Sequence, residues 1–282
     1  MKPLFFLLCA WLISTATIAQ SQVAPQIVEI SSGALRLKAY LWKPTGAGPF
    51  PAVVFNHGRS DSPQQHTHNL TITAAAQVLG PVFVKHGYVF LYLFRRGEGL
   101  SADQGTFIGD ILQREEDARG KEARKHLQLV LVTTDHLDDA KAGLSFVRTL
   151  PYVDVHRIAV AGHSFGGQLT LLVAERDSTA RAAVAFAPAA ASWDGSAELR
   201  EQMLAAVRKI NVPVMFLQAA NDYSLTPSQA MADELSRLSK TNVRKLYPPI
   251  GETASDAHNF LYTDVTVWEQ DVFAFLGANV GR

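Results

Sequence analysis

The chain has 282 residues, enough to bury one large hydrophobic core, and 48% of them are apolar. Charged residues make up 18%, which is typical of a folded globular protein and excludes a disordered one. The 26 basic and 26 acidic residues cancel, so no net field favours nucleic acid or an anionic membrane, and we expect no nucleic-acid partner.

The first residues have the pattern of a secretory leader. A positive charge at Lys2 precedes an apolar run over residues 4–13, and small and polar residues then lead to Thr17 and Ala19, which suit a signal-peptidase site. The run is shorter than the roughly 20 apolar residues of a membrane-spanning helix. We expect a signal peptide over residues 1–19, a secreted or periplasmic protein, and no stable membrane insertion after leader removal. An uncleaved anchor is the alternative.

Cys9 is the only cysteine, and it lies inside this leader. A mature chain over residues 20–282 would therefore hold no cysteine, which excludes disulfides, a thiolate nucleophile and cysteine-ligated metal. No repeat or linker divides these residues, so we expect a single domain that is stabilised by core packing alone.

Apolar strand-like runs alternate with helical patterns from residue 26 onward. Residues 27–30 and 35–41 flank a turn at 31–33, which predicts an antiparallel hairpin. The later strand runs are continuous and apolar, as buried parallel strands are: 52–55, 89–94, 158–161, 182–186, 214–217 and a weaker one at 243–247. Helical patterns cover 70–86, 137–147, 165–176, 196–209, 227–239 and 263–277. This alternation predicts an α/β fold, with a mostly parallel central sheet, helices on both faces and the antiparallel hairpin at the N-terminal edge.

A charged segment within residues 111–130 interrupts the alternation. Nine of the twelve residues from 114 to 125 are charged, with Gly120 in the middle. Glu115 and Arg119 are four residues apart, a spacing that supports a solvated helix. The pattern favours a surface helix in a long connection, and a small cap over the active site is the alternative.

A Gly-x-Ser-x-Gly motif, Gly162 to Gly166, follows the strand run at 158–161 and precedes a helical pattern. In this strand–turn–helix context the motif is typical of a nucleophile elbow, in which Ser164 would occupy a sharp, strained turn. The glycines let strand and helix approach each other. The helix N-terminus supplies N–H groups and a positive dipole end for a developing oxyanion. We expect Ser164 to be the nucleophile of a serine hydrolase.

A serine hydroxyl needs a base to take its proton and a carboxylate to orient that base. Asp222 follows the strand run at 214–217, and His258 follows the last candidate strand. The resulting order of serine, aspartate and histidine is that of α/β hydrolases. We expect His258 as the base and Asp222 as the acid. Asp194, after the preceding strand, and Asp256, close to His258, are the alternatives for the acid.

These motifs resemble those of the α/β-hydrolase superfamily, and within it the dienelactone-hydrolase-like and prolyl-oligopeptidase-like branches. The resemblance runs from about residue 27 to the end, and it is carried by the segments 55–59, 95–99, 153–167, 221–222 and 256–258. It implies an oxyanion hole formed by the backbone N–H groups of Phe165 and Arg59. Dienelactone hydrolases proper use a cysteine nucleophile, so the resemblance does not carry their substrate over to a chain with a serine.

The remaining histidines are expected to have structural roles. His57 and His163 flank the site and would brace loops, as such residues do in the families that the chain resembles. His66 and His68 have a spacing that zinc sites use, but no further ligands accompany them, so a solvated loop is favoured. We therefore expect no metal and no cofactor.

Together these residues predict acyl transfer, in which Ser164 attacks an ester carbonyl and water then hydrolyses the acyl-enzyme. The polar loop at 59–69 and the charged segment predict a wet pocket mouth, which favours short-chain or small polar esters over lipids. Arg95 and Arg96 would either contact an acidic substrate or stabilise a turn. Two alternatives remain open: a serine peptidase of the prolyl-oligopeptidase type that acts on small peptides, and a non-catalytic binding protein on the same fold. The sequence does not indicate the oligomeric state.

Overall fold

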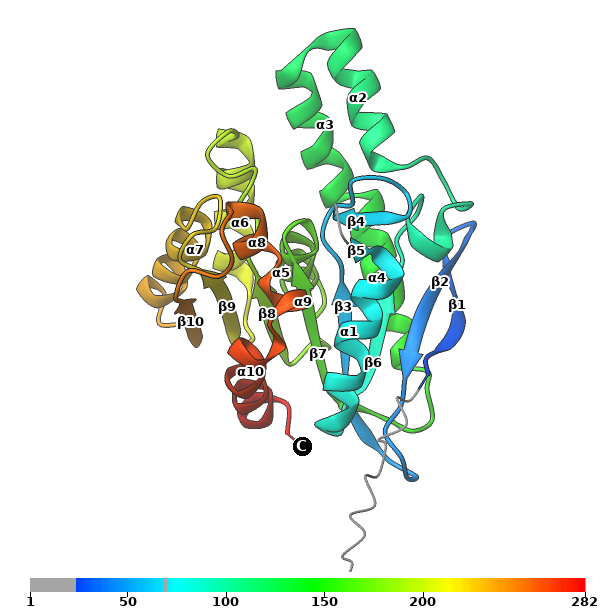
Figure 1. Cartoon of the computed structure of the whole chain (residues 1–282). Helices are drawn as coiled ribbons and strands as arrows, with labels where there is room; N and C mark the ends of the chain where they lie inside the picture. The colour runs from blue at the N-terminus through cyan, green and yellow to red at the C-terminus, as the bar shows by residue number, and fades with distance from the viewer. Residues whose placement is uncertain (1–23, 68–69, 282) are drawn as a thin grey trace, which may run out of the picture.

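The computed structural model describes residues 24–67 and 70–281 of the chain. The predicted leader, residues 1–19, lies outside them. An eight-stranded sheet forms the centre of the molecule, in the order β1-β2-β6-β3-β7-β8-β9-β10 (Figure 1). Its strands are β1 (Gln26–Ser32), β2 (Leu35–Trp42), β3 (Phe50–Asn56), β6 (Val89–Leu93), β7 (Val153–His163), β8 (Ala182–Phe186), β9 (Val214–Ala219) and β10 (Asn242–Tyr247). The short strands β4 (Gln65–Thr67) and β5 (Leu70–Thr71) pair separately.

The strand directions confirm the predicted sheet. β1 and β2 form an antiparallel hairpin at one edge, and β2 is also antiparallel to β6. In the rest of the sheet, β6-β3-β7-β8-β9-β10, each pair of neighbouring strands is parallel. Every residue of β6, β8 and β9 is buried, because helices cover both faces of the sheet.

Six helices follow the predicted pattern: α1 (Ile72–Lys85), α4 (Asp135–Val147), α5 (Phe165–Arg176), α6 (Ala197–Lys209), α7 (Thr226–Arg237) and α10 (Val265–Asn279). The apolar sides of α4, α5, α6 and α7 pack in one core cluster, and those of α1 and α10 pack in the cluster on the other face. The arrangement is the α/β-hydrolase fold that the resemblance implied. Within residues 24–67 and 70–281, no helix is both long and apolar enough to cross a membrane.

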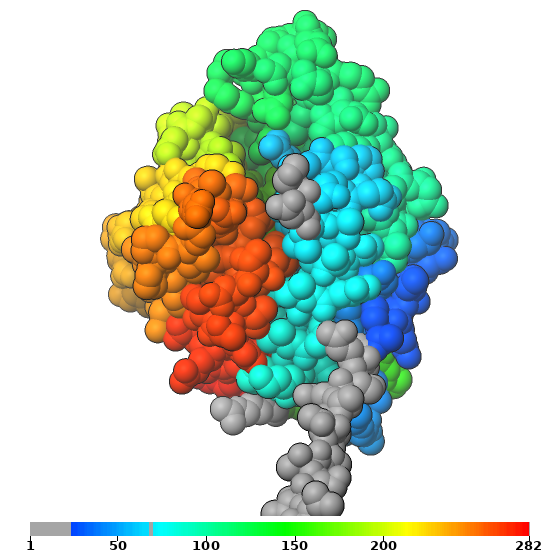
Figure 2. Space-filling view, viewed as in Figure 1, coloured from blue at the N-terminus to red at the C-terminus, as the bar shows by residue number. Residues whose placement is uncertain are grey.

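The charged segment forms two helices, α2 (Ile108–Arg119) and α3 (Lys121–Thr133). Gly120 separates them with a φ of +86°, a conformation that favours glycine. The Arg119 side chain donates to Glu115 at 2.7 Å, which is the i,i+4 pair that the spacing predicted. The two helices project as a hairpin from the body of the molecule, and Figure 2 shows the surface hollowed below it.

The connections at the carboxyl ends of the strands carry the remaining short elements. These are a 3₁₀ turn (Gly99–Ser101) after β6, and the helices α8 (Ala254–His258) and α9 (Phe260–Thr263) after β10. Because all the parallel strands end at the same edge, their loops meet there. That edge carries the candidate site.

Candidate active site

Ser164 lies in the turn between β7 and α5, at the carboxyl end of a central strand. Its φ of 54° and ψ of −114° form a strained conformation for a residue that carries a side chain. The Ser164 N–H donates to the Phe186 carbonyl at 2.9 Å, and the Gln168 N–H donates to the Ser164 carbonyl at 3.1 Å. The neighbouring strand and the first turn of α5 therefore hold this residue in place.

Two glycines permit the turn. A Cβ on Gly162 would lie 2.3 Å from the carbonyl oxygen of Gly166, and a Cβ on Gly166 would lie 1.9 Å from the carbonyl oxygen of Asn56. Both separations are far shorter than any van der Waals contact, and in each case the obstacle is backbone. The helix can start so close to β3 and β7 only because these positions lack side chains.

Asp222 and His258 meet in this region. His258 ends α8, and its Nδ1 lies 2.8 Å from Oδ1 of Asp222. The buried Asp222 carboxylate also accepts from the Tyr223 N–H at 2.7 Å and from Nε2 of Gln218 at 2.8 Å. Since a carboxylate only accepts, these partners place the imidazole proton on Nδ1 and leave Nε2 with a free lone pair.

A chain of hydrogen bonds between side chains ends on the Asp222 carboxylate and holds it in place. Ser228 donates to Oε1 of Gln218, whose Nε2 donates to Asp222, and Nε of Arg244 donates to Oγ of Ser228 at 3.2 Å. The chain links β10, α7 and β9 to the loop that carries Asp222. Sequence reasoning missed it, because these polar residues are far apart in the chain and belong to no motif.

The two other candidate acids are engaged elsewhere. The Asp256 carboxylate caps α8, where it accepts from the Thr253 N–H at 2.9 Å and from the Thr253 hydroxyl at 2.8 Å. Asp194 is exposed. Of the three carboxylates that the sequence left open, the structure brings Asp222 to His258.

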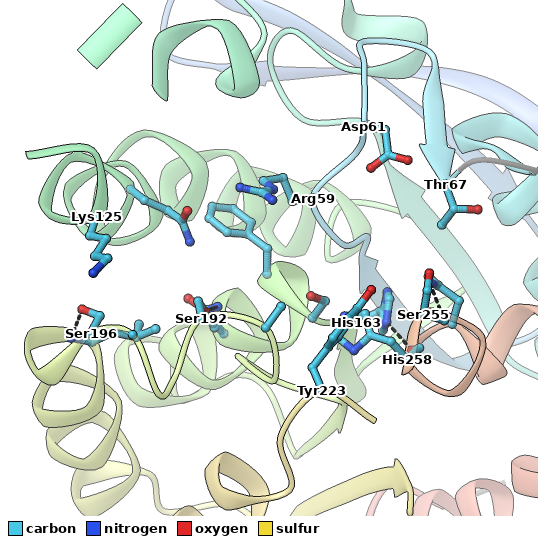
Figure 3. A pocket seen from close by; sticks show the side chains of 18 of the residues that line it. Arg59, Asp61, Thr67, Lys125, His163, Ser192, Ser196, Tyr223, Ser255 and His258 are labelled. Carbon is cyan, nitrogen blue, oxygen red and sulfur yellow. Dashed lines mark hydrogen bonds between the residues drawn. The ribbon is translucent and has the colours of Figure 1, made fainter. Parts of the chain in front are cut away.

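Ser164, Phe165, Arg59 and His258 all line one pocket with a cavity volume of about 380 Å³. In Figure 3, His258 and Tyr223 lie at one end of the pocket. Ser192, Ser196 and Lys125 lie toward the other end, and Arg59 lies between the two groups. The structure thus brings together all five residues that the sequence placed in the site.

The charged segment takes part in this pocket. Arg124, Lys125, Gln128 and Leu129 of α3 line it, so α3 forms one wall, while the favoured interpretation of the segment was a surface helix. The wall is mostly polar, and both of its cations are ion-paired, Arg124 with Glu116 at 3.1 Å and Lys125 with Glu122 at 2.7 Å. Partial desolvation, together with the nearby Arg124 guanidinium, lowers the pKa of Arg59.

Histidines form a buried layer behind the pocket. Nε2 of His163 contacts the carbonyl oxygen of His258 at 2.8 Å, a bracing contact of the kind that was expected. The prediction of a solvated loop at His66 is wrong, because its side chain is only 2% exposed and its ring packs edge-on against Tyr262 at 4.9 Å. His68 lies outside the described residues. Among the residues that are described, no group of three or more metal-binding side chains is placed to hold an ion.

The arginines expected near the site are both held by protein partners. Arg95 is fully buried and ion-paired with Glu98 at 2.9 Å. Arg96 donates to both oxygens of Asp139, at 2.9 and 2.7 Å. Of the two interpretations of these arginines, the structure supports the stabilisation of local backbone.

The fold and the pocket at the ends of its parallel strands define an α/β hydrolase. The model of the dienelactone hydrolase family matches residues 101–261, more than half of the chain. The chain therefore belongs to the dienelactone hydrolase family.

Among curated proteins, the quorum-quenching protein AidA of Acinetobacter baumannii (strain MDR-ZJ06) is 28% identical over 165 residues, which are 58% of this chain and 44% of AidA. Among solved structures, Est1E from Butyrivibrio proteoclasticus with bound ferulic acid matches with a TM-score of 0.63 and 17% identity, over 90% of this chain and 100% of Est1E. A puromycin-hydrolyzing peptidase of Mycobacterium tuberculosis matches with a TM-score of 0.65 and 16% identity, over 92% of this chain and 40% of the peptidase.

A Pyrococcus horikoshii acylaminoacyl peptidase also matches, with a TM-score of 0.61 and 17% identity, over 92% of this chain and 42% of the peptidase. The chain thus spans less than half the length of AidA and of both peptidases. At these identities, the likeness to the solved structures shows the fold alone.

Burial keeps four histidines uncharged. It lowers the pKa of His66 to about 3, and it lowers the pKa values of His57, His136 and His163 well below the ordinary value of 6.5. The nearby Arg95 guanidinium contributes to the shifts of His57, His66 and His136. All four side chains belong to the interior of the folded state.

These shifts predict a loss of stability in acid. Unfolding exposes the imidazoles, which then bind protons below about pH 6.5, so the unfolded state binds more protons than the native one. The free energy of unfolding should be greatest above about pH 7 and fall on acidification by up to about 1.4 kcal/mol per pH unit for each histidine. Denaturant titrations at several pH values measure this slope.

The variants His136→Phe and His156→Asn make a matched pair, because His136 is buried and His156 is exposed. His136→Phe should lower the slope of unfolding free energy against pH by the contribution of about one proton, and His156→Asn should leave that slope unchanged. A free energy of unfolding that stays constant from about pH 7.5 to about pH 5.5 would contradict the assignment.

Proposed function

We propose that the protein hydrolyses carboxylic esters through an acyl-enzyme on Ser164, with His258 as general base and Asp222 as its orienting carboxylate. One observation carries the proposal: Ser164, in a strained turn, and His258, bound to Asp222 through Nδ1, line the same pocket. A serine hydroxyl becomes nucleophilic when a neighbouring imidazole accepts its proton, and Nε2 of His258 is the nitrogen left free for this step.

The developing oxyanion would be stabilised by two backbone N–H groups. Phe165 is the first residue of α5, so its N–H has no acceptor within the helix and lies at the positive end of the helix dipole. The Arg59 N–H makes no hydrogen bond within the part of the chain that the structure describes. Both residues line the pocket, and we assign them the oxyanion hole.

We propose short-chain or small polar esters as substrates. The pocket holds about 380 Å³ and is lined by hydroxyl and amide side chains and by Arg59, Arg124 and Lys125, along with a few apolar side chains such as Leu129 and Leu199. A lipase needs a broad apolar face to meet lipid, and a charged α3 does not supply one. Cyclic esters fit the same chemistry, and the name of the family refers to a lactone.

A serine peptidase acting on small peptides is the second candidate, because several structural neighbours are peptidases. Those neighbours are more than twice as long as this chain, and the match leaves most of each peptidase uncovered. Est1E was solved with bound ferulic acid, a carboxylic acid of the kind that ester hydrolysis releases, which supports the ester hydrolase as the first candidate. A non-catalytic binding protein on the same fold is the third candidate, and loss of turnover on substitution of Ser164 would exclude it.

Ser164→Ala is expected to lower ester hydrolysis by on the order of 10³-fold or more, because the acyl-enzyme needs the serine oxygen. Hydrolysis of p-nitrophenyl acetate measures the effect, with circular dichroism to establish that the variant folds. Ser192→Ala is the matched control, since Ser192 lines the same pocket and is expected to leave turnover within a few-fold of wild type. A folded Ser164→Ala variant with near wild-type turnover would exclude the mechanism.

Asp222→Asn is expected to lower kcat by on the order of 10⁴-fold, since an amide does not hold the imidazole in the required tautomer. Asp194→Asn and Asp256→Asn should have small effects, because neither carboxylate contacts His258. Steady-state kinetics on one ester compares the three variants. A large loss in Asp194→Asn together with a small loss in Asp222→Asn would assign the acid to the earlier strand.

The small volume of the pocket and its charged α3 wall predict the substrate range. We expect kcat/KM on p-nitrophenyl esters to be highest between acetate and hexanoate, with slow cleavage of an aminoacyl p-nitroanilide. The measurement is a series of esters from acetate to palmitate with the anilide included. An optimum beyond decanoate would indicate a lipid substrate, and anilide cleavage as fast as that of the esters would favour the peptidase.

A further inference from the structure

The loop after β3 carries Arg59, whose N–H we assign to the oxyanion hole. This N–H and the Gly58 carbonyl belong to one peptide group, so they are coplanar and point in opposite directions. Whatever holds the Gly58 carbonyl therefore also sets the direction of the Arg59 N–H. The contacts of that carbonyl lie on the buried side of the loop, away from the pocket.

Two side-chain nitrogens lie within hydrogen-bond distance of the Gly58 carbonyl oxygen. Nη2 of Arg95 lies 3.0 Å from it, and Nδ1 of His57 lies 2.7 Å from it. The His57 ring is packed between Arg95 and this carbonyl, because Nη2 of Arg95 also lies 3.0 Å from Nδ1 of His57 and the Arg95 N–H lies 3.5 Å from Nε2. The Gly58 carbonyl thus receives a cationic donor from the buried side of the loop, with the His57 ring beside it.

The same guanidinium makes further contacts that fix it in place. Nη1 of Arg95 donates to the His57 carbonyl at 2.6 Å, and Nη2 donates to Glu98 at 2.9 Å. Glu98 in turn accepts from the Ser60 N–H at 3.4 Å. Arg95 and Glu98 are both 0% exposed, so the pair is enclosed by protein and spans the loop from residue 57 to residue 60.

Arg95 also reaches the other half of the oxyanion hole. Its guanidinium carbon lies 5.3 Å from the centre of the Phe165 ring, a cation–π distance. Phe165 supplies the second N–H, from the first turn of α5. One side chain therefore contacts both segments whose N–H groups would bind the oxyanion.

We propose that Arg95 is a positioning residue of the oxyanion hole, which aims and polarises the Gly58–Arg59 peptide through the Gly58 carbonyl and holds the Phe165 segment beside it. The inference rests on the proposed ester hydrolysis. It assigns a role in the transition state to a residue that does not itself reach the pocket.

The physical argument is that hydrogen bonds in a chain strengthen one another. A positive donor on the carbonyl oxygen draws electron density from the peptide, so the opposite N–H becomes a better donor to the oxyanion. The site is closed to water on this side, and the effect is therefore not screened. The oxyanion carries far more charge than the ester carbonyl, so the stronger hydrogen bond stabilises the transition state more than the bound substrate.

Arg95→Met tests the proposal, because methionine roughly fills the space and removes both the charge and the donors. Loss of a whole oxyanion donor lowers kcat by about 10²- to 10³-fold. For a misaligned donor we expect kcat to fall by about 10- to 100-fold, with KM changed less than about threefold. Arg95→Lys keeps the charge and one donor and should retain more activity than Arg95→Met.

Arg96→Met is the matched control. It makes the same substitution one position along, where the guanidinium pairs with Asp139 and not with the loop. Its kcat should stay within about threefold of wild type. If Arg95→Met does not fold by circular dichroism and thermal unfolding, Arg95→Lys and Glu98→Gln carry the test with the same measurements.

The second measurement is the affinity for two inhibitors. If Arg95 only stabilised the fold, its substitution would not change the ratio of these two affinities. A trifluoromethyl ketone forms an oxyanion on a nucleophilic serine, whereas the matching methyl ketone binds mostly as the ground state. Across wild type, Arg95→Lys and Arg95→Met, affinity for the trifluoromethyl ketone should fall in proportion to kcat/KM, with methyl ketone affinity nearly constant. Unchanged kcat in Arg95→Met, or equal weakening of both ketones, would overturn the proposal.

The two proposals fail separately. If Ser164→Ala retains turnover, the proposed ester hydrolysis is wrong whatever the Arg95 variants do. If Ser164→Ala abolishes turnover and Arg95→Met leaves kcat unchanged, ester hydrolysis stands and only the role of Arg95 is wrong.

Discussion

The close approach of α5 to the ends of β3 and β7 is the constraint on which the rest of the site depends. A Cβ on Gly166 would lie 1.9 Å from the Asn56 carbonyl oxygen, so helix and strand meet through bare backbone. The approach forces Ser164 into its strained conformation and lifts it to the edge of the sheet. It also brings the start of α5 beside the loop after β3, where Arg59 lies. The same close approach thus sets the positions of the nucleophile and of the proposed oxyanion donors.

A buried polar layer supports this edge from the core side. Arg95 and Glu98 hold the loop after β3, His163 contacts the His258 carbonyl, and Gln218 holds the carboxylate of Asp222. Burying a polar group without a hydrogen-bond partner costs free energy of folding. A buried polar layer is therefore expected where its hydrogen bonds orient groups that apolar packing would not orient. Here it fixes the directions of backbone groups and of one imidazole. Its histidines are neutral because burial opposes their charge, which makes the layer sensitive to acid.

The sequence predicted most of the fold, because parallel strands buried on both faces appear as continuous apolar runs and the helices between them as periodic ones. It also placed Ser164, Asp222 and His258 at strand ends, where the fold would bring them together. For residues 111–130 it favoured a surface helix and left a cap over the site as the alternative. A run of charges indicates solvent exposure, but it does not indicate that α3 also lines the pocket. His66 was misassigned for a related reason: a polar loop folds inward when aromatic rings such as Tyr262 can cover it. The links from Gln218 and Arg95 depend on contacts across the chain that no local pattern encodes.

The central claim is that Ser164 is an activated nucleophile, and covalent labelling tests it most directly. A fluorophosphonate reacts with a serine whose proton is taken by a neighbouring base and whose oxyanion is stabilised. After brief exposure, intact-mass analysis should find a single adduct, and peptide mapping should locate it on Ser164. Labelling should be lost in Ser164→Ala and strongly slowed in Asp222→Asn. An unlabelled wild-type protein, or an adduct on another serine such as Ser192, would contradict the account.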